Sequence, residues 1–208
     1  MIPKEQLQLF NTNLRHEDPI ETVQFLLSQS KRPMISTSFG PRSAALLHLV
    51  TSVKPDIPVV WCDTGFNTEA TYRHAVNLTE MLELNLEVFS PERTTAFLRS
   101  QLGDPGLDNP NHSELSRLAK LEPFERALSK YQPDCWFSNL RAGQTDHRNL
   151  IDILSFHSEG VLKASPFYYY SNAQLDDYMF GNQLPFEPNY FDPIKALSKR
   201  ECGIHFDR

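Results

Sequence analysis

Short strand-like segments alternate with segments of helical periodicity in the first half of the chain, and this order constrains the fold more than any other feature. Residues 34–38 and 57–62 are strand-like, and the second run is apolar throughout, which is typical of a parallel strand buried on both faces. Apolar residues at helical spacing follow each run, over 42–53 and 68–84. Because parallel strands need crossover connections, the pattern predicts an α/β fold with a parallel twisted sheet flanked by helices.

The rest of the chain continues the same pattern. We expect further strands over 86–89, 135–138 and 161–165, a less regular element over 150–156, and helices over 19–28, 113–130 and 172–180. The stretch 103–111 is rich in Gly, Asp, Asn and Pro, which predicts a loop. No repeat or linker divides the 208 residues, so we expect a single domain over 1–208, with a flexible C-terminal tail from about 184 to 208.

Charge and composition exclude several classes of protein. The chain has 20 Lys and Arg against 26 Asp and Glu, a net charge of −6, which argues against a nucleic-acid partner. It has no apolar run of membrane-spanning length and no signal-peptide pattern near residue 1, so we expect a cytoplasmic protein with no membrane partner. Its cysteines, Cys62, Cys135 and Cys202, are odd in number and widely spaced, which disfavours a disulfide framework and a metal knuckle.

The first candidate binding motif is the hydroxyl-rich segment 36–43, Ser-Thr-Ser-Phe-Gly-Pro-Arg-Ser, between a predicted strand and a predicted helix. Free backbone N–H groups and the helix dipole favour an anion at such a place. The segment is neither a Walker A loop nor a GxGxxG motif. The candidate anion-binding residues here are Ser36, Ser38, Phe39, Gly40 and Arg42, and the alternative is an ordinary capped turn.

A second motif, Asp63-Thr64-Gly65, follows the apolar strand over 57–62. In α/β folds, residues at this end of a strand contact ligands, so Asp63 and Thr64 are candidates for binding a ribose or a metal. They are equally suited to capping the next helix.

Cations follow the later strands. The segment 139–148 contains Arg141 and Arg148, and arginine side chains bind phosphate or sulfate bidentately. A solvated loop is the alternative. Lys163 lies inside the apolar strand over 161–165, which is uncommon for lysine unless it reaches solvent or meets an anion.

The C-terminal segment contains a cysteine of a different kind from the other two. Lys199 and Arg200 precede Cys202, and His205 follows it by three residues. Because the thiolate is the nucleophile and neighbouring cations stabilise it, Cys202 is the candidate for covalent chemistry. A buried structural cysteine is the alternative, which fits Cys62 and Cys135 better.

Several of these segments together resemble the phosphoadenosine phosphosulfate reductase family, and they occur in that family's order. The resemblance runs from about residue 34 to residue 205, and its most specific part is the Lys-Arg-Glu-Cys-Gly-Ile-His sequence over 199–205. It implies an adenine nucleotide α-hydrolase-like (PP-loop) fold, in which the segment 36–40 cradles the phosphosulfate of the substrate. It also implies a homodimer. The other matching segments are 63–65 with 69–73, 84–89, 139–141 and 163–166.

The resemblance also implies the chemistry. Cys202 would attack the sulfo group of 3′-phosphoadenosine 5′-phosphosulfate, releasing adenosine 3′,5′-bisphosphate, and thioredoxin or glutaredoxin would then free sulfite from the cysteine S-sulfonate. Arg200 and His205 would neutralise the sulfonate. Arg141, Arg148, Lys163 and Lys199 would hold phosphate and sulfate oxygens. The family branch with an iron–sulfur cluster has two cysteine pairs that this chain lacks, so no cluster, metal or other cofactor is expected.

The chain departs from the family pattern in three places, one of which is the unusual Pro41-Arg42 in the segment expected to bind phosphate. About two dozen residues of the segment before the final cysteine have no counterpart here, by our estimate from the motif pattern. The segment 139–144, Asn-Leu-Arg-Ala-Gly-Gln, has one arginine where the family has two. Two alternatives therefore stay open, a PP-loop ATP pyrophosphatase-type enzyme that adenylates a substrate or transfers sulfur, and a nucleotide-binding relative that has lost catalysis.

Overall fold

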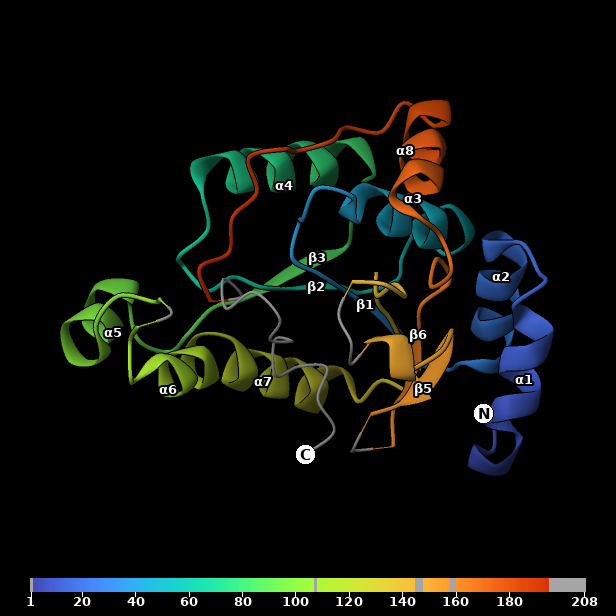
Figure 1. The fold of residues 1–208 in the computed structure, drawn as a ribbon, viewed down its shortest axis with the longest axis horizontal. Coiled ribbons are helices and arrows are strands. Elements are labelled where there is room, and N and C mark those ends of the chain that lie inside the picture. Colours follow the sequence, from blue (N-terminus) through green and yellow to red (C-terminus); the bar gives the residue numbers. More distant parts are fainter. Residues whose placement is uncertain (1, 107, 145–147, 158–159, 195–208) are drawn as a thin grey trace.

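The structure, a computed structural model, describes residues 2–106, 108–144, 148–157 and 160–194. Its centre is a six-stranded sheet in the order β3-β2-β1-β4-β6-β5, in which only β5 runs antiparallel to its neighbour (Figure 1). The predicted α/β fold with a mostly parallel sheet is therefore confirmed. The strands are β1 (Pro33–Thr37), β2 (Val59–Cys62), β3 (Leu86–Phe89), β4 (Cys135–Phe137), β5 (Leu154–Phe156) and β6 (Leu162–Ala164).

Side chains alternate between the two faces of the sheet, as the strand geometry requires. Ile35, Val59 and Phe137 join the larger hydrophobic core on one face, whereas Met34 and Trp136 join a smaller core on the other. Both faces are apolar because helices cover both, which explains why residues 57–62 form a continuous apolar run.

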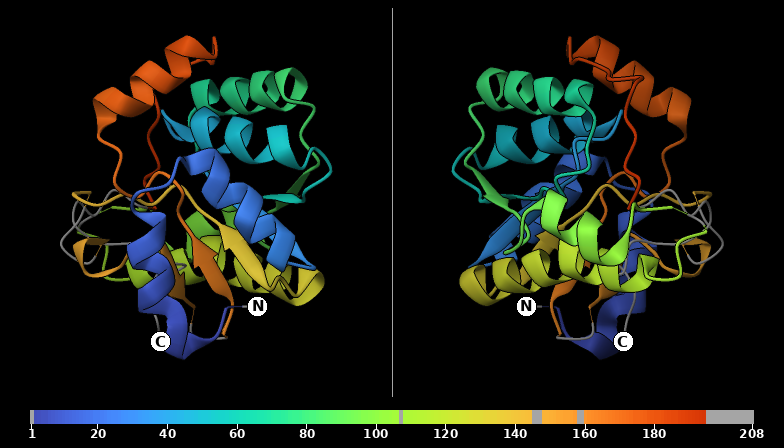
Figure 2. Two further views of the ribbon diagram at one scale, coloured as in Figure 1. Left: turned by 90° about the vertical axis from the view of Figure 1, so that its right-hand side faces the viewer. Right: turned by 90° about the vertical axis from the view of Figure 1, so that its left-hand side faces the viewer.

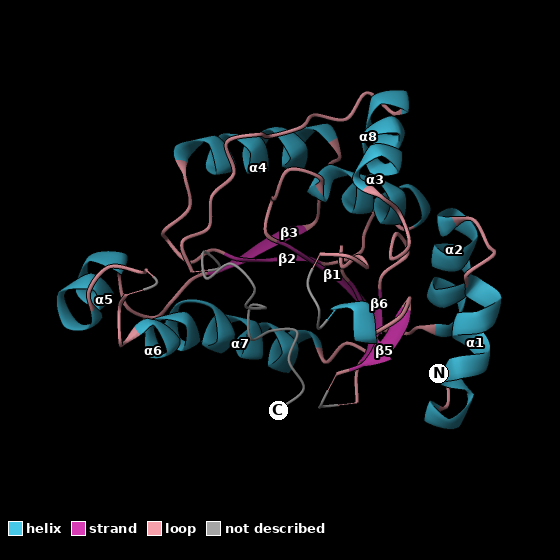
Figure 3. Cartoon of the chain, viewed as in Figure 1, coloured by secondary structure: helices cyan, strands magenta, loops and turns pink. Residues whose placement is uncertain are grey.

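Helices form a layer on each face of the sheet (Figures 1, 2 and 3). The helices on the side of the larger core are α2 (Pro19–Gln29), α3 (Ser43–Val53), α4 (Glu69–Met81) and α8 (Asn172–Gly181). The opposite layer contains α5 (Thr95–Leu102), α6 (His112–Ser116) and α7 (Glu122–Tyr131). Short 3₁₀ turns cover Lys4–Gln6 and Arg148–Leu150.

The N-terminal helix α1 (Leu7–Leu14) packs against the edge strand β5. The side-chain amide of Asn11 donates to the Leu154 carbonyl at 2.9 Å and accepts from the Leu154 amide at 2.8 Å. The buried Asn11 side chain thus makes the pair of hydrogen bonds that a neighbouring strand would make.

Some elements differ from the sequence expectation. The helix expected over 113–130 is divided into α6, a π-helical turn (Arg117–Leu121) and α7, and neither α1 nor α5 was expected. The irregular element over 150–156 contains β5. The weak helical stretch expected near 194–199 lies almost entirely outside the described residues.

The sheet order determines where a ligand can bind. Strand β1 pairs with β2 on one side and with β4 on the other, so the chain leaves its carboxyl end toward one neighbour and later returns to the opposite side. Connections diverge at such a switch point and leave a crevice at the carboxyl ends of the strands. The segments that follow β1 and β4 should therefore line the site.

No helix among the described residues combines the length and the apolar character that crossing a bilayer requires.

Truncating a side chain of the larger core should destabilise the fold more than truncating an exposed one. Leu78 on α4 is fully buried, whereas Met81 on the same helix has 49% of its surface exposed. We expect Leu78→Ala to lower the free energy of unfolding by about 2–5 kcal/mol, because it removes packed methyl groups and leaves a cavity. Met81→Ala should change it by less than about 1 kcal/mol. Urea unfolding followed by circular dichroism measures both, and equal losses in the two variants would contradict this core assignment.

Candidate functional site

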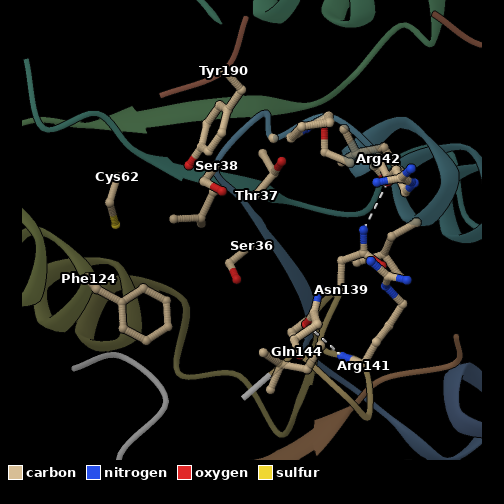
Figure 4. Close-up of a pocket in the computed structure, with 18 of the residues that line it drawn as sticks. Ser36, Thr37, Ser38, Arg42, Cys62, Phe124, Asn139, Arg141, Gln144 and Tyr190 are labelled. Carbon is tan, nitrogen blue, oxygen red and sulfur yellow. Dashed lines mark hydrogen bonds between the residues drawn. The ribbon is translucent and has the colours of Figure 1, made fainter. Parts of the chain in front are cut away.

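A polar cavity of about 310 Å³ opens at the carboxyl ends of β1 and β4, where the sheet order predicts a ligand (Figure 4). We call it the switch-point pocket. Its walls are formed by the ends of β1 and β2, the segment after β1 with the start of α3, and the segment after β4. The π-helical turn with the start of α7 and one residue of the segment after α8 complete them. Its lining residues include Ser36, Ser38, Gly40, Arg42, Ser43, Cys62, Lys120, Phe124, Asn139, Arg141, Gln144, Arg148 and Tyr190.

The segment after β1 turns sharply before α3 begins. Phe39 has a positive φ of 48°, and its backbone amide donates to Thr37 Oγ1 at 3.0 Å. The Phe39 ring is fully buried and packs edge-on against Trp61, with ring centroids 5.0 Å apart. The predicted contact residue Phe39 is thus a core anchor beneath the loop, and its side chain does not line the pocket.

The hydroxyl groups of this segment lie at the pocket wall. Ser36 Oγ accepts a hydrogen bond from Trp136 Nε1 at 2.7 Å, which fixes it against the neighbouring strand β4. Ser43 is the first residue of α3, where backbone N–H groups have no partner within the helix. At Gly40, a Cβ atom would lie 3.9 Å from the ring of Tyr190, so this aromatic ring covers the turn.

Three buried polar atoms in the pocket wall have no hydrogen-bond partner among the described residues. They are Ser43 Oγ, Asn139 Oδ1 and Arg141 Nε. Leaving a buried polar group unpaired costs about 1–3 kcal/mol, so their gathering in one cavity needs an explanation. A ligand that carries both donors and acceptors would satisfy all three.

Arg141 is the most buried cation of the segment after β4, with 7% of its surface exposed. Its Nη1 donates to the Tyr170 carbonyl at 3.3 Å, and its backbone amide donates to Gln144 Oε1 at 3.0 Å. Gln144 Oε1 also accepts from Arg148 Nη1, so one amide organises both arginines. Burial lowers the pKa of Arg141, and repulsion from Arg42 and Arg148 lowers it further. A bound anion would offset both effects.

Arg42 differs from Arg141 in that it forms an ion pair with a carboxylate. Its Nε and Nη2 donate to the two carboxylate oxygens of Asp176 on α8, at 2.7 and 2.8 Å, and its guanidinium lies 5.2 Å from the centre of the Phe186 ring. The Asn139 side-chain amide donates to the Arg42 carbonyl at 2.9 Å. Arg42 therefore lines the pocket, but a carboxylate already pairs with its charge.

Asp63 and Thr64 do not line the pocket. The Asp63 carboxylate accepts from the Gly65 amide at 3.0 Å, from Asn67 Nδ2 at 2.9 Å and from the Tyr72 hydroxyl at 2.8 Å. Thr64 Oγ1 accepts from the Phe66 amide at 3.3 Å. Burial, followed by the Asp63 carboxylate, raises the pKa of Tyr72 to about 12. These contacts organise the turn that leads toward α4, whose N-cap is Thr68, so neither Asp63 nor Thr64 caps that helix.

Lys163 is buried in β6, and it too lies outside the pocket wall. Its ammonium lies 5.5 Å from the centre of the Trp136 ring, and the same indole binds Ser36. The Trp136 ring therefore links Lys163 to the hydroxyl of a pocket residue.

The structure adds pocket residues that the sequence did not single out. Lys120, Phe124 and Tyr190 come from segments without a recognisable binding motif, and Cys62 was expected to be only structural. Asn139 and Gln144 lie within the segment 139–148, but only its arginines were predicted to bind. Cys135, by contrast, is a buried free cysteine in β4, and burial raises the pKa of its thiol.

The candidate residues of the C-terminal segment, Lys199, Arg200, Cys202 and His205, lie outside the described residues.

Comparisons with known proteins bear on the family and the fold of the chain. The family model "Phosphoadenosine phosphosulfate reductase domain" matches residues 32–197. A phosphoadenosine 5′-phosphosulfate reductase of Xylella fastidiosa is 33% identical and is aligned over 98% of this chain and 95% of its own length. An enzyme of the same name from Aliivibrio salmonicida is 33% identical, with coverages of 97% and 89%. The Xylella alignment spans 229 positions against the 208 residues here, so this chain has gaps at 21 or more of them.

Solved structures show the same fold. A phosphoadenylyl-sulfate reductase from Candida auris, solved as a phosphate complex, superimposes with a TM-score of 0.79 at 20% identity, covering 90% of each chain. An FMN adenylyltransferase of Candida glabrata superimposes with a TM-score of 0.59 at 11% identity, covering 81% of this chain and 56% of that one. The adenylyltransferase likeness concerns the fold alone. With a family model that covers most of the sequence and relatives aligned over nearly its full length, the chain belongs to the phosphoadenosine phosphosulfate reductase family.

Proposed function

We propose that this protein reduces 3′-phosphoadenosine 5′-phosphosulfate to sulfite and adenosine 3′,5′-bisphosphate. The observation that carries the proposal is the switch-point pocket, in which three unpaired buried polar atoms line one cavity of a chain that belongs to this reductase family. The cavity volume of about 310 Å³ lies at the lower end of the range for small-molecule sites.

The charge distribution supports an anionic substrate. The protein has a net charge of −6, yet Arg42, Arg141 and Arg148 all line the same cavity. The sulfonucleotide carries about four negative charges, which such a cluster attracts and orients. Ser36, Ser38, Gly40 and the start of α3 would hold the phosphosulfate by hydrogen bonds.

In the first half-reaction we assign the nucleophile to Cys202. Its thiolate attacks the sulfur of the sulfo group, the bond from sulfur to the phosphate oxygen breaks, and the electron pair leaves with adenosine 3′,5′-bisphosphate. Arg200 and His205 stabilise the charge on the transferred sulfonate, and Lys199 adds a further cation. No metal or iron–sulfur cluster is needed for this step.

In the second half-reaction a dithiol donor frees the product. One thiolate of thioredoxin or glutaredoxin attacks the Cys202 sulfur, sulfite leaves with the electron pair of the S–S bond, and the second thiol of the donor resolves the mixed disulfide. Two electrons thus pass from the donor to the sulfonate sulfur. We assign this reaction to the cytoplasm, where thiol donors are kept reduced, and to a homodimer.

The path of the chain is compatible with this role for Cys202. The segment after α8 ends, within the described residues, at Ile194, which packs with Leu98 and Leu115 next to the pocket residue Lys120. Cys202 is eight residues further along the chain. Eight residues extend over at most about 28 Å, so the tether allows the thiol to reach the cavity.

Intact mass after mixing reduced protein with the sulfonucleotide tests the nucleophile. We expect a gain of about 80 Da that thioredoxin removes, because a sulfonated thiol carries one added SO₃ group. Cys202→Ser should abolish the gain, and Cys135→Ala should retain it because the Cys135 thiol is buried in β4. Absence of the gain in the unmodified protein, or its persistence in Cys202→Ser, would contradict the assignment.

Arg141→Gln tests the binding site. The change removes a buried cation that faces the pocket, and we expect the Kd for adenosine 3′,5′-bisphosphate to rise about 30-fold or more, with little change for neutral adenosine. Arg73→Gln on α4 is the matched control, because it removes the same charge from an exposed ion pair with Glu69. Titration calorimetry measures these values. A similar Kd in the two variants would mean that the nucleotide binds elsewhere.

A PP-loop enzyme that cleaves ATP is the alternative hypothesis, and the fold shared with the FMN adenylyltransferase is compatible with it. It predicts pyrophosphate release from ATP and Mg²⁺ that does not depend on Cys202. A nucleotide-binding relative without catalysis predicts tight binding of adenosine 3′,5′-bisphosphate with no gain in mass.

A further inference from the structure

A buried ion pair joins the pocket wall to the segment that follows α8. Lys120 Nζ donates to Asp192 Oδ2 at 2.7 Å, and the two side chains are only 4% and 2% exposed. Lys120 belongs to the π-helical turn between α6 and α7 and lines the switch-point pocket. Asp192 lies in the segment that leaves α8, runs beside α4 and reaches the α6 side of the sheet (Figure 1). The two residues are 72 positions apart in the sequence.

The surrounding contacts hold the Asp192 carboxylate in place. Its Oδ1 accepts from the Ile194 amide at 3.0 Å, and Ile194 is buried in a small core with Leu98 and Leu115. Two residues earlier, Tyr190 lines the pocket and covers Gly40. The segment therefore brings a buried negative charge to Lys120, whereas the charged residues that line the cavity itself are all cationic.

The buried Lys120 and Asp192 charges act strongly on an anion in the pocket because little water screens them. Because both groups are removed from water, an anion that approaches the Lys120 ammonium is also repelled by the carboxylate beside it. The pair as a whole is neutral, so Lys120 offers an entering anion hydrogen bonds but almost no net charge. Arg42 also pairs with a carboxylate, that of Asp176, but this pair is partly exposed and its charges are better screened by water.

We propose that Asp192 is a built-in counter-ion which cancels the charge of Lys120 and thereby limits the affinity of the pocket for anionic nucleotides. The inference rests on the proposed function, since the anions in question are the sulfonucleotide and adenosine 3′,5′-bisphosphate. Asp192 acts through Lys120 and is thus a positioning residue. A limited affinity suits turnover, because the bisphosphate product has to leave the cavity after each sulfonate transfer.

Removing the carboxylate tests the proposal. Asp192→Asn keeps an acceptor for the ammonium but removes its charge, and we expect adenosine 3′,5′-bisphosphate to bind about tenfold more tightly while neutral adenosine binds as before. The affinity should also fall more steeply with added salt, since one more cation is exposed to the ligand. Asp192→Glu should keep the affinity of the unmodified protein. Asp56→Asn, at an exposed ion pair with Lys54, is the control for net charge.

Removing both charges makes the test robust against loss of folding. Lys120→Met combined with Asp192→Leu replaces a buried ion pair by apolar groups, a change that proteins often tolerate. We expect this double variant to bind the bisphosphate within about threefold of the unmodified protein, whereas Lys120→Gln alone should weaken binding about tenfold. Opposite effects of the two single variants, with the double variant between them, are the signature of charge cancellation.

Two results would overturn the proposal. One is an affinity in Asp192→Asn that is unchanged or weaker for the bisphosphate. The other is a double variant that binds as weakly as Lys120→Gln, which would mean that the lysine acts at full charge despite its partner. If the unmodified protein does not bind adenosine 3′,5′-bisphosphate, the proposed function fails. The same comparison with inorganic pyrophosphate as the anion then still tests the counter-ion.

Discussion

The hydrogen-bonded pairing of β1 with both β2 and β4 is the constraint on which the rest of the structure depends. Ile35 lies in register with Val59 on one side and with Phe137 on the other, so the segments that follow β1 and β4 emerge side by side. The polar groups that follow β1 and β4 in the switch-point pocket owe their juxtaposition to this pairing. The geometry of the site therefore depends on the packing of the core. A shift of register would move the Trp136 indole away from the Ser36 hydroxyl that it binds.

Charge is distributed in this protein so that a net acidic surface surrounds a cationic cavity. Within the described residues, the basic side chains at the cavity are constrained in different ways. Arg42 and Lys120 pair with carboxylates, whereas Arg141 is buried with its Nε unpaired. A buried cation without a full set of partners is a costly arrangement, and its persistence at a ligand site is the usual sign that binding energy completes it.

The sequence allowed the sheet, the main helices and two of the loops at the site to be predicted, because period-two and helical patterns are local properties. The split of the helix expected over 113–130 was not predictable from an apolar pattern that continues through the π-helical turn. The direction of β5 was not predictable either, since alternation carries no information on strand polarity. Phe39 and Asp63 were assigned to binding from their positions, but the backbone conformation of their turns directs one side chain into the core and commits the other to local hydrogen bonds. Lys120 and Asp192 become neighbours only through the tertiary fold.

The contact between α1 and β5 protects an edge of the sheet. A sheet edge offers unpaired amides and carbonyls to any other extended chain, and natural proteins cover such edges. Here the buried side-chain amide of Asn11 makes hydrogen bonds with the backbone groups of Leu154, as a neighbouring strand would. The N-terminal helix thus covers this edge of the sheet. Removing that helix would expose the outward-facing backbone groups of Leu154 and turn β5 into a template for β-sheet aggregation.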